Sequence, residues 1–370
     1  MKRVKFGDIV REVKIQVDRN NNPYPHYVAG DHMDSMDLTI RRKGCFATDD
    51  VGPAFIRIFK PGQVLYGSRR TYLKKIAVAD FEGICSNTTF VLETKDSNVF
   101  LQELLPFVML SDSFTKWSIS HSKGSTNPYV LFSDLANYEF TLPSLDEQKV
   151  LADKLWAAYR VKESYKKLLT ATDDMLKAKF IEMFGDPLKN DKQWNIKPLS
   201  EVAPELASNH TEKGNVWNLN LDMIESGTGL LIEKIYAPFE SLNSVVAFDE
   251  GNVLYSKLRP YLNKVIIPDA KGYATTELVP LRPDINLLNA DFLCHILRSE
   301  QFVKYANGIA TGTKMPRMPM AELRKFGCIL PPLSLQQEFV NIATQAEATK
   351  ESLRKSIENI DQVIKSLINQ

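Results

Sequence analysis

One sequence pattern occurs twice in this chain. The first copy reads Gly62-Gln63-Val64-Leu65-Tyr66 and continues through Arg70, Tyr72-Leu73 and Lys75. The second reads Gly251-Asn252-Val253-Leu254-Tyr255 and continues, at matching spacing, through Arg259, Tyr261-Leu262 and Lys264. Carried on to Gly83 and Gly272, ten of 22 aligned positions are identical at an offset of 189, where average composition gives about one or two. The match therefore indicates an internal repeat.

Two further anchors extend this repeat along the chain. Gly124-Ser125-x-x-Pro128 recurs as Gly312-Thr313-x-x-Pro316 at an offset of 188. Leu142-Pro143-x-Leu145-x-x-Gln148 recurs as Leu330-Pro331-x-Leu333-x-x-Gln336 at the same offset. Three anchors in one order predict that the 370 residues are two copies of one unit of about 188 residues.

Each copy ends in a segment with helical periodicity. Capping-box patterns, Ser144-x-x-Glu147 and Ser334-x-x-Gln337, predict where these helices begin, and Gly185 predicts where the first one ends. Apolar residues spaced by three and four favour a coiled-coil pair about 55 Å long; two separate helices, each covering its own domain, remain the alternative. The expected seams are Leu151, Leu155, Ala158, Tyr165, Leu169, Leu176, Phe180 and Met183, interrupted by Lys162 and Thr172, and Phe339, Ile342, Ala346, Leu353, Ile357, Ile360, Ile364 and Leu367, interrupted by Thr349.

The rest of each copy has the mixed pattern of a small α+β head. Short β-type runs, Val64–Tyr66 with Lys75–Ala79 and Val253–Tyr255 with Lys264–Ile267, flank a polar turn in each copy. Helices are expected at Asn98–Leu110 and Ala290–Tyr305. The predicted fold class is thus α+β, with two repeated globular heads alternating with two long helices.

Composition excludes several classes of protein. The chain has 46 Lys+Arg and 45 Asp+Glu, a net charge of +1, so it is neither a polycation nor an acidic tail. The longest apolar run, Leu104–Leu110, is too short to cross a bilayer, and the N-terminus lacks the pattern of a signal peptide. Scattered cysteines indicate a reduced, cytoplasmic protein, and adjacent Cys294 and His295 are expected to face different sides of a helix Asp291–Arg298.

No catalytic constellation emerges from the sequence. Asn22-Pro23-Tyr24-Pro25 and Asn127-Pro128-Tyr129 resemble the Asn-Pro-Pro-Tyr box of amino-methyltransferases, but each lacks the second proline. No Gly-rich cofactor loop or phosphate loop is present. We therefore expect no catalytic residues, no metal site and no cofactor.

Binding chemistry repeats instead. Basic, amide and aromatic side chains gather on the turn of each hairpin and on the Gly-Ser/Thr loop that follows it. Such groups can contact base edges and phosphates, although any one of them could be structural. The candidate DNA-binding residues are Arg69, Arg70, Tyr72, Lys74, Lys75, Lys123, Ser125 and Thr126 in the first copy, and Lys257, Arg259, Tyr261, Asn263, Lys264, Thr313, Lys314 and Arg317 in the second.

Taken together, these motifs resemble the specificity (S) subunits of type I restriction–modification systems, over nearly the whole chain. The resemblance implies two target recognition domains at 1–142 and 187–330, and spacer helices at 143–186 and 331–370 that pair as an antiparallel coiled coil. It also implies a non-catalytic subunit that binds double-stranded DNA, reads one half-site with each domain, and has no membrane partner.

The same resemblance implies partners that carry the chemistry. Two methyltransferase (M) subunits would supply adenine-N6 methylation and restriction (R) subunits would supply ATP-dependent cleavage. The near-neutral charge suits a subunit that shares phosphate neutralisation with others. The alternative hypothesis is a two-headed coiled-coil scaffold that binds protein partners instead of DNA.

Overall fold

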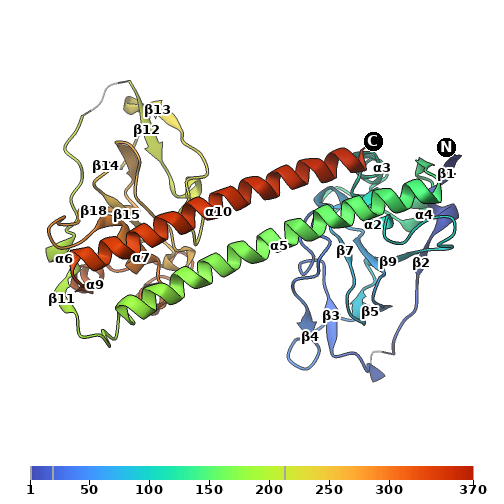
Figure 1. Ribbon diagram of the computed structural model, residues 1–370, viewed down its shortest axis with the longest axis horizontal. Helices are drawn as coiled ribbons and strands as arrows, with labels where there is room; N and C mark the ends of the chain where they lie inside the picture. Colours follow the sequence, from blue (N-terminus) through green and yellow to red (C-terminus); the bar gives the residue numbers. More distant parts are fainter. Residues whose placement is uncertain (1, 19–20, 212–213, 370) are drawn as a thin grey trace. The chain divides into compact units, whose positions relative to one another are not determined.

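The structure is a computed structural model that describes residues 2–18, 21–211 and 214–369. Residue contacts divide the chain into two units, which we call unit 1 (Met1–Lys166 with Arg354–Gln370) and unit 2 (Lys167–Leu353). The boundaries fall inside the two long helices, α5 (Leu145–Phe184) and α10 (Leu333–Ile368), so each helix contributes one half to each unit (Figure 1).

Unit 1 is built on two four-stranded sheets and one two-stranded ribbon, in the orders β2-β9-β6-β7, β4-β3-β8-β5 and β1-β10. Three short helices, α2, α3 and α4, follow β9 in the chain and precede β10, the second strand of the ribbon. The elements are β1 (Lys2–Lys5), α1 (Phe6–Ile9), β2 (Val10–Val13), β3 (His26–Val28), β4 (Gly44–Cys45), β5 (Phe55–Phe59), β6 (Val64–Gly67), η2 (Thr71–Leu73), β7 (Ile76–Val78), β8 (Gly83–Ser86), β9 (Thr89–Thr94), α2 (Leu105–Leu110), α3 (Asp112–Ser120), α4 (Phe132–Ala136) and β10 (Glu139–Leu142).

Unit 2 repeats this plan with the sheets β16-β15-β18, β13-β12-β17-β14 and β11-β19. Its elements are β11 (Asn195–Pro198), α6 (Leu199–Val202), β12 (Asn215–Leu219), η3 (Leu221–Met223), β13 (Tyr236–Pro238), η4 (Phe239–Ser241), β14 (Val245–Phe248), β15 (Val253–Ser256), η5 (Pro260–Leu262), β16 (Val265–Ile266), β17 (Gly272–Thr275), β18 (Leu278–Leu281), α7 (Ala290–Arg298), α8 (Glu300–Ile309), α9 (Met320–Lys325) and β19 (Gly327–Leu330).

The two units share strand pairing as well as order. The parallel pair β3–β8 of unit 1 corresponds to the parallel pair β12–β17 of unit 2, and each is flanked by an antiparallel neighbour. The ribbons β1–β10 and β11–β19 also correspond, since each closes its unit just before a long helix. The predicted duplication and the predicted α+β class are both confirmed.

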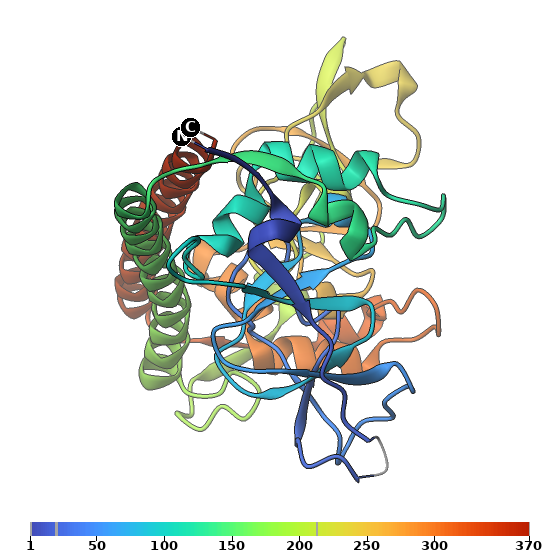
Figure 2. The same cartoon turned by 90° about the vertical axis from the view of Figure 1, so that its right-hand side faces the viewer.

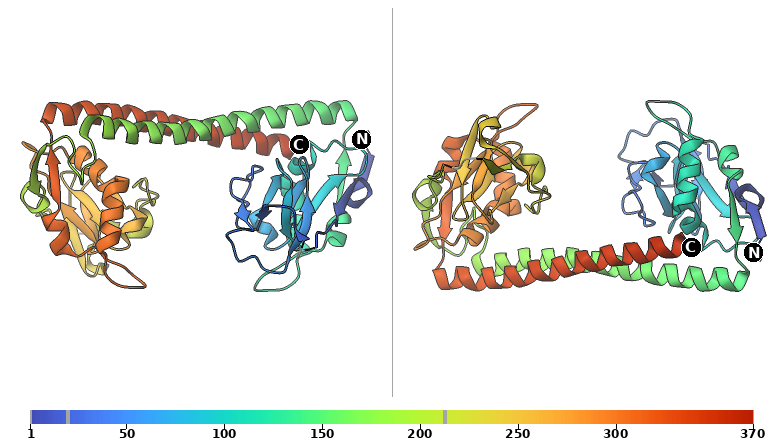
Figure 3. Two further views of the ribbon diagram at one scale, coloured as in Figure 1. Left: turned by 90° about the horizontal axis from the view of Figure 1, so that it is seen from below. Right: turned by 90° about the horizontal axis from the view of Figure 1, so that it is seen from above.

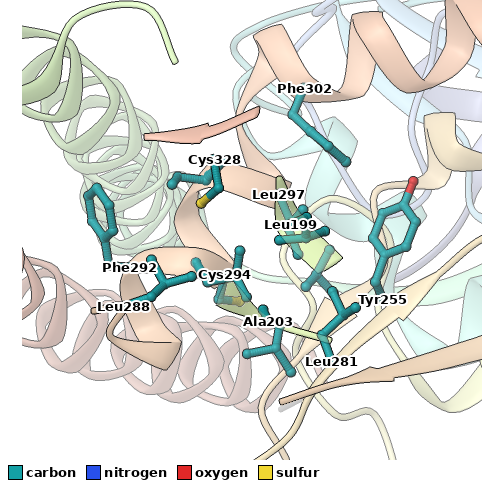
Figure 4. Packing of buried hydrophobic residues seen from close by; sticks show 14 of the residues in the cluster. Leu199, Ala203, Tyr255, Leu281, Leu288, Phe292, Cys294, Leu297, Phe302 and Cys328 are labelled. Carbon is teal, nitrogen blue, oxygen red and sulfur yellow. The ribbon is translucent and has the colours of Figure 1, made fainter. Parts of the chain in front are cut away.

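The hydrophobic core of unit 2 forms where the three-stranded sheet meets the helices. Apolar side chains from β15, β18, α6, α7 and β19 converge there (Figure 4). Phe180 and Phe184 of α5 and Phe339 of α10 belong to the same cluster. Phe184 packs edge-on against Phe292 with ring centroids 4.7 Å apart. The long helices are therefore part of the core, which explains why each unit needs a half of both.

Antiparallel pairing of α5 with α10 is visible within each unit, where the two ribbons run side by side (Figure 2 and Figure 3). Two buried lysines of the seam each form an ion pair with the facing helix. In unit 1 the buried Lys162 of α5 pairs with Asp361 of α10, and in unit 2 the buried Lys350 of α10 pairs with Asp173 of α5 at 2.6 Å. The lysines are 350 − 162 = 188 residues apart and the aspartates 361 − 173 = 188, so the repeat produces one ion pair twice, with the roles of the helices exchanged.

The polar breaks of the seams were predicted with mixed success. Lys162 is buried as expected of a seam position, at 7% exposure. Thr349, in contrast, is exposed, and the buried polar residue of α10 is its neighbour Lys350. The prediction for Thr349 was wrong because a strict heptad count drifts relative to a helix of 3.6 residues per turn.

Helix boundaries follow local capping chemistry. The first capping box forms, since the Ser144 amide donates to Glu147 at 2.8 Å and the Glu147 amide donates to Ser144 Oγ at 3.4 Å. Helix α5 ends as predicted, before Gly185, whose φ is +75°. The second capping box was wrong: α10 begins at Leu333, before Ser334, and the Pro332 carbonyl accepts its first helical hydrogen bonds.

Two shorter helices also differ from expectation. Residues 98–104 are not part of a helix; the Asp96 carboxylate accepts hydrogen bonds from the Asn98 backbone and side chain, a local turn that competes with helix, and α2 begins only at Leu105. The predicted helix Ala290–Tyr305 is broken into α7 and α8 at Ser299, which caps α8 by accepting from the Phe302 amide at 3.2 Å.

The glutamine that ends the Leu-Pro-x-Leu-x-x-Gln motif attaches each long helix to its head. Gln148 is 1% exposed. Its Nε2 donates to the carbonyls of Val99 and Pro143, both at 3.0 Å, and its Oε1 accepts from the Leu101 amide at 3.0 Å. Unit 2 repeats all three bonds, from Gln336 Nε2 to the Leu287 carbonyl at 3.0 Å and the Pro331 carbonyl at 2.8 Å, and from the Asn289 amide to Gln336 Oε1 at 2.9 Å.

Candidate nucleic-acid interface

The polar turn of each hairpin has the same unusual backbone. Arg70 and Lys74 in unit 1 have φ of 51° and 47°, and Arg259 and Asn263 in unit 2 have φ of 50° and 48°. A left-handed conformation is uncommon for residues other than glycine. Each pair flanks a single turn of 3-10 helix, η2 or η5. Two identical outliers four residues apart, found in both copies, indicate a turn whose shape is preserved by the rest of the unit.

That turn is joined to the Gly-Ser/Thr loop in both units. The Arg70 amide donates to the Pro128 carbonyl at 2.7 Å, and the Arg259 amide donates to the Pro316 carbonyl, also at 2.7 Å. A second bond follows on the other side of each turn, from Val130 to the Ser68 carbonyl at 3.0 Å and from Met318 to the Lys257 carbonyl at 2.9 Å. The two polar segments that the sequence singled out separately therefore form one surface in each unit, which we call the turn–loop platform.

Four of the candidate residues donate from their side chains to backbone carbonyls of their own unit. Lys74 Nζ donates to the Leu110 carbonyl at 3.4 Å and pairs with Asp112 at 3.2 Å, and its counterpart Asn263 donates to the Arg298 carbonyl at 2.9 Å. Each acceptor carbonyl lies at the end of a helix, α2 or α7, so these side chains cap helices. The Lys74 ammonium also lowers the pKa of the Asp112 carboxyl.

Lys75 and Lys264 fasten the other side of the turn. Lys75 Nζ donates to the Gly30 carbonyl, and Lys264 Nζ donates to the Leu221 carbonyl at 2.6 Å. Both acceptors lie in the segment that follows a strand of the second sheet, after β3 or β12. These lysines have a visible structural task, which the sequence pattern alone did not distinguish from a binding one.

The remaining candidates are exposed or half-buried. Tyr72 and Tyr261 occupy equivalent positions and are 54% and 50% exposed. Lys257 and Arg259 are half-buried, and no hydrogen-bond partner for Arg259 Nε lies among the described residues. The exposed candidates of unit 1 are Arg69, Arg70, Lys123, Ser125 and Thr126, and those of unit 2 are Thr313, Lys314 and Arg317.

Two exposed cations of the platform have acidic partners. Lys123 lies 3.3 Å from Asp134. Arg317 forms a two-pronged contact with Glu277, from Nε at 3.0 Å and from Nη2 at 2.8 Å, which raises the pKa of the guanidinium. Glu277 was not singled out in the sequence, because it lies 40 residues away from Arg317 and follows no motif.

A buried tyrosine under the platform differs between the units. In unit 1, burial raises the pKa of Tyr66 to about 12, and hydrogen bonds with Ser118 and Thr71 act in the opposite direction. In unit 2, Tyr255 is 3% exposed, and its hydroxyl has no hydrogen-bond partner in the described part of the chain. Ala306 stands at the place of Ser118, 188 residues on, which removes one hydroxyl partner.

The adjacent Cys294 and His295 lie in α7. Cys294 is buried, which raises the pKa of its thiol. His295 packs edge-on against Phe339 at 5.0 Å, and burial, with help from Arg298 and Lys350, lowers its pKa from 6.5 to about 4. Among the described residues, no group of three or more His, Cys, Asp and Glu side chains could hold a metal ion. None of the helices described is both long and apolar enough to cross a membrane.

Comparison with protein families identifies one matching model. Residues 55–170 and 192–362 match the type I restriction modification DNA specificity domain, so the model matches twice, once in each copy of the repeat.

Curated relatives agree with that match. Over 298 residues the chain is 24% identical to the type I restriction enzyme EcoDI specificity subunit of Escherichia coli, a match covering 68% of this chain and 66% of the relative. It is 23% identical over 315 residues to the MjaVIII specificity subunit of Methanocaldococcus jannaschii, covering 78% and 73%. The chain thus spans about two thirds of the length of the first of these relatives and somewhat more of the second.

Solved structures show the same fold. One comes from a study of complex assembly and conformational transition of the type I R-M system, at 20% identity and a TM-score of 0.57, covering 99% of this chain and 96% of that one. Another is the S subunit of a type I restriction–modification system from M. genitalium, at 11% identity and a TM-score of 0.57, covering 99% and 94%. The fold of this chain, with its repeated units and long helices, is therefore similar to that of both solved structures.

Proposed function

Because the chain belongs to the family of type I restriction–modification DNA specificity domains, we propose that it recognises a bipartite DNA target for such a complex. Each head would read one half-site of double-stranded DNA. The proposed target recognition domains are residues 1–142 and 187–330, and the proposed spacer helices are residues 143–186 and 331–370. The chain itself would carry no catalytic step.

The observation that carries this proposal is the turn–loop platform. Its backbone bonds are the same in both units, including the 2.7 Å bond from Arg70 or Arg259 to a proline carbonyl. Its exposed side chains differ: Arg69 and Lys123 of unit 1 correspond to Leu258 and Thr311 of unit 2. A preserved scaffold with divergent basic, aromatic and hydroxyl groups suits the reading of two different base sequences.

Partners would complete the activity. Two methyltransferase (M) subunits would bring adenine-N6 methylation, and restriction (R) subunits would bring ATP-dependent cleavage, in the cytoplasm. The net charge of +1 supports sharing of the DNA contact, since a subunit acting alone would have to neutralise the phosphates by itself.

The test is to sequence genomic DNA with detection of modified bases, from cells with and without this chain. We expect N6-methyladenine at a motif of two short half-sites separated by an unread spacer, and its loss when the chain is removed. A methylation pattern that does not depend on the chain would contradict the proposal and favour a scaffold that binds proteins.

A second experiment tests the assignment of one head to one half-site. Residues 1–142 are exchanged for the first head of another S subunit, and the unit 2 head is left as a control. We expect only one half of the motif to change. A change in both halves would contradict the assignment.

A further inference from the structure

Each turn–loop platform contains one row of three residues paired across two antiparallel bridges. In unit 1, Tyr129 pairs with Arg69 of the turn on one side and with Lys123 of the loop on the other. In unit 2, Arg317 occupies the central place, between Leu258 and Thr311. We call these rows the bridge rows.

The side chains of a bridge row share one face of the platform. Residues directly opposite each other in an antiparallel pair have Cβ atoms about 4.5–5.5 Å apart and point to the same side. The row is accessible, since Arg69, Lys123, Tyr129 and Arg317 are exposed. Three adjacent side chains therefore present a strip wide enough to contact neighbouring groups of one ligand.

The backbone of the row is constant while all three side chains change. The bonds between Lys123 and Tyr129 measure 2.7 and 2.9 Å, and those between Thr311 and Arg317 measure 3.0 and 2.9 Å. Arginine occurs in both rows, but at the turn in unit 1 (Arg69) and at the centre in unit 2 (Arg317). The two rows thus have the same backbone pairing but carry their arginine at different positions.

In unit 2 the carboxylate of Glu277 pairs with the central arginine, Arg317. Glu277 receives two prongs of the Arg317 guanidinium, and its own backbone carbonyl accepts from Lys257 of the turn at 3.0 Å. The corresponding bond in unit 1, from Ser68 at 3.1 Å, goes to the carbonyl of Thr88, which has no carboxylate. The acid is therefore present in the unit whose arginine occupies the centre of the row.

Such a pairing orients a guanidinium without using all of it. The contact with Glu277 involves Nε and Nη2, and a guanidinium has five N–H donors in a fixed plane. The N–H groups that point away from Glu277 can still donate to the two acceptors, O6 and N7, that guanine presents in the major groove.

We propose that the bridge rows are specificity-determining strips of the two target recognition domains. Arg69 contacts a guanine of one half-site, beside Tyr129 and Lys123. Arg317 contacts a guanine of the other half-site, between Leu258 and Thr311, and Glu277 is a positioning residue that acts through Arg317. This inference rests on the proposed function, because it needs each head to read a half-site.

The experiment uses the full chain with its methyltransferase partner, and it reads the methylated motif and the affinity for DNA carrying that motif. Arg317→Ala is expected to relax one position of one half-site and to weaken binding about 5- to 150-fold, the effect of losing one bidentate base contact. Arg69→Ala is expected to do the same in the other half-site. In each variant the unchanged half-site reports that the chain is folded.

The control is Arg324→Ala, since Arg324 has the same two-pronged contact, with Glu205, outside the bridge row. It should leave the motif and the affinity unchanged. Glu277→Ala should lower discrimination at the same base as Arg317→Ala, and the double variant should lose no more than Arg317→Ala alone, because the two residues act as one. A merely structural Glu277 would give additive losses instead.

The outcomes separate this inference from the function on which it rests. If the unaltered chain directs a bipartite motif and both Arg69→Ala and Arg317→Ala leave it unchanged, the bridge rows do not determine specificity. The same conclusion follows if one substitution alters both half-sites. If the unaltered chain directs no motif at all, the proposed function fails first.

Discussion

Replacing Gln336 by leucine should loosen the junction between helix α10 and the head of unit 2. Leucine is close to glutamine in size but has no polar atoms, so the substitution removes all three hydrogen bonds of a side chain that is 0% exposed. The carbonyls of Leu287 and Pro331 and the amide of Asn289 then lose their partner.

The magnitude follows from the number of bonds. A hydrogen bond within a protein contributes about 0.5–1.5 kcal/mol net, so three bonds amount to about 3 kcal/mol. Since 1.36 kcal/mol corresponds to a factor of ten, local opening of this junction should become about 100-fold more frequent. The Asn289 amide is the direct reporter because it donates to the replaced side chain at 2.9 Å.

Hydrogen–deuterium exchange measured by mass spectrometry tests this expectation. Exchange of the segment 287–289 should accelerate about 100-fold, while the equivalent segment 99–101 of unit 1 keeps its rate because Gln148 is intact. Gln148→Leu should give the reverse pattern. The control is Gln345→Leu, which alters an exposed glutamine of the same helix.

Two exchange results would contradict this role of Gln336. An exchange rate of 287–289 within about threefold of the unaltered protein would mean that the three bonds contribute little beyond what water supplies. Acceleration of both segments by Gln336→Leu would mean that the glutamine supports the whole molecule and not one junction.

The buried side chains of Lys162, Tyr255 and His295 should each affect stability in a measurable way. Asp361→Ala should lower the free energy of unfolding of unit 1 by about 1–2 kcal/mol because it leaves the buried Lys162 ammonium unpaired, whereas Lys162→Met should cost less; denaturant midpoints that rank the two the other way would contradict this. Ala306→Ser should raise the melting temperature by placing a hydroxyl near the unpartnered Tyr255, with a gain of about 0.5–1.5 kcal/mol in the free energy of unfolding, and Ser118→Ala should lower that free energy by a similar amount. A lower melting temperature for Ala306→Ser would mean that the hydroxyl does not fit. The pKa of His295 is about 4 in the folded protein and 6.5 in the unfolded chain, so the unfolded state binds more protons between these values and the free energy of unfolding should fall as the pH decreases from 6.5 to 4. His295→Leu should flatten this decline in denaturation curves measured across that range, and an equal slope in both proteins would contradict the lowered pKa.

Much of the architecture could be predicted because it follows from identical residues in the two copies and from the periodic spacing of apolar residues. The repeat rests on identical residues that recur at offsets of 188 and 189, and Gln148 and Gln336 among them make the same three hydrogen bonds in their units. Helical periodicity indicated α5, and the capping box at Ser144 and the glycine at Gly185 located its two ends. Boundaries were missed at Asn98, where the Asp96 carboxylate forms a local turn that competes with helix, and at Ser334, where α10 begins one residue earlier, at Leu333.

The candidate site was predicted as a region and not as a set of contacts. The turn and the loop were both located, but their union depends on hydrogen bonds such as Arg70 to Pro128, between residues 58 apart. Lys74 and Lys75 could not be told from binding residues, since the carbonyls to which they donate lie 36 and 45 residues away in the sequence.

The duplication, the α+β class and the two long helices can be inferred from the amino-acid sequence, because residue identity and periodicity are properties of the linear chain. Which polar side chains are available to a ligand depends on the folded arrangement. Lys162 interrupts a seam in the sequence, and in the fold its buried ammonium pairs with Asp361. Glu277 follows no motif, and in the fold it accepts from the Arg317 guanidinium. In both cases the partner is distant along the chain, and the low exposure or fixed orientation that gives each charge its role exists only after the chain has folded.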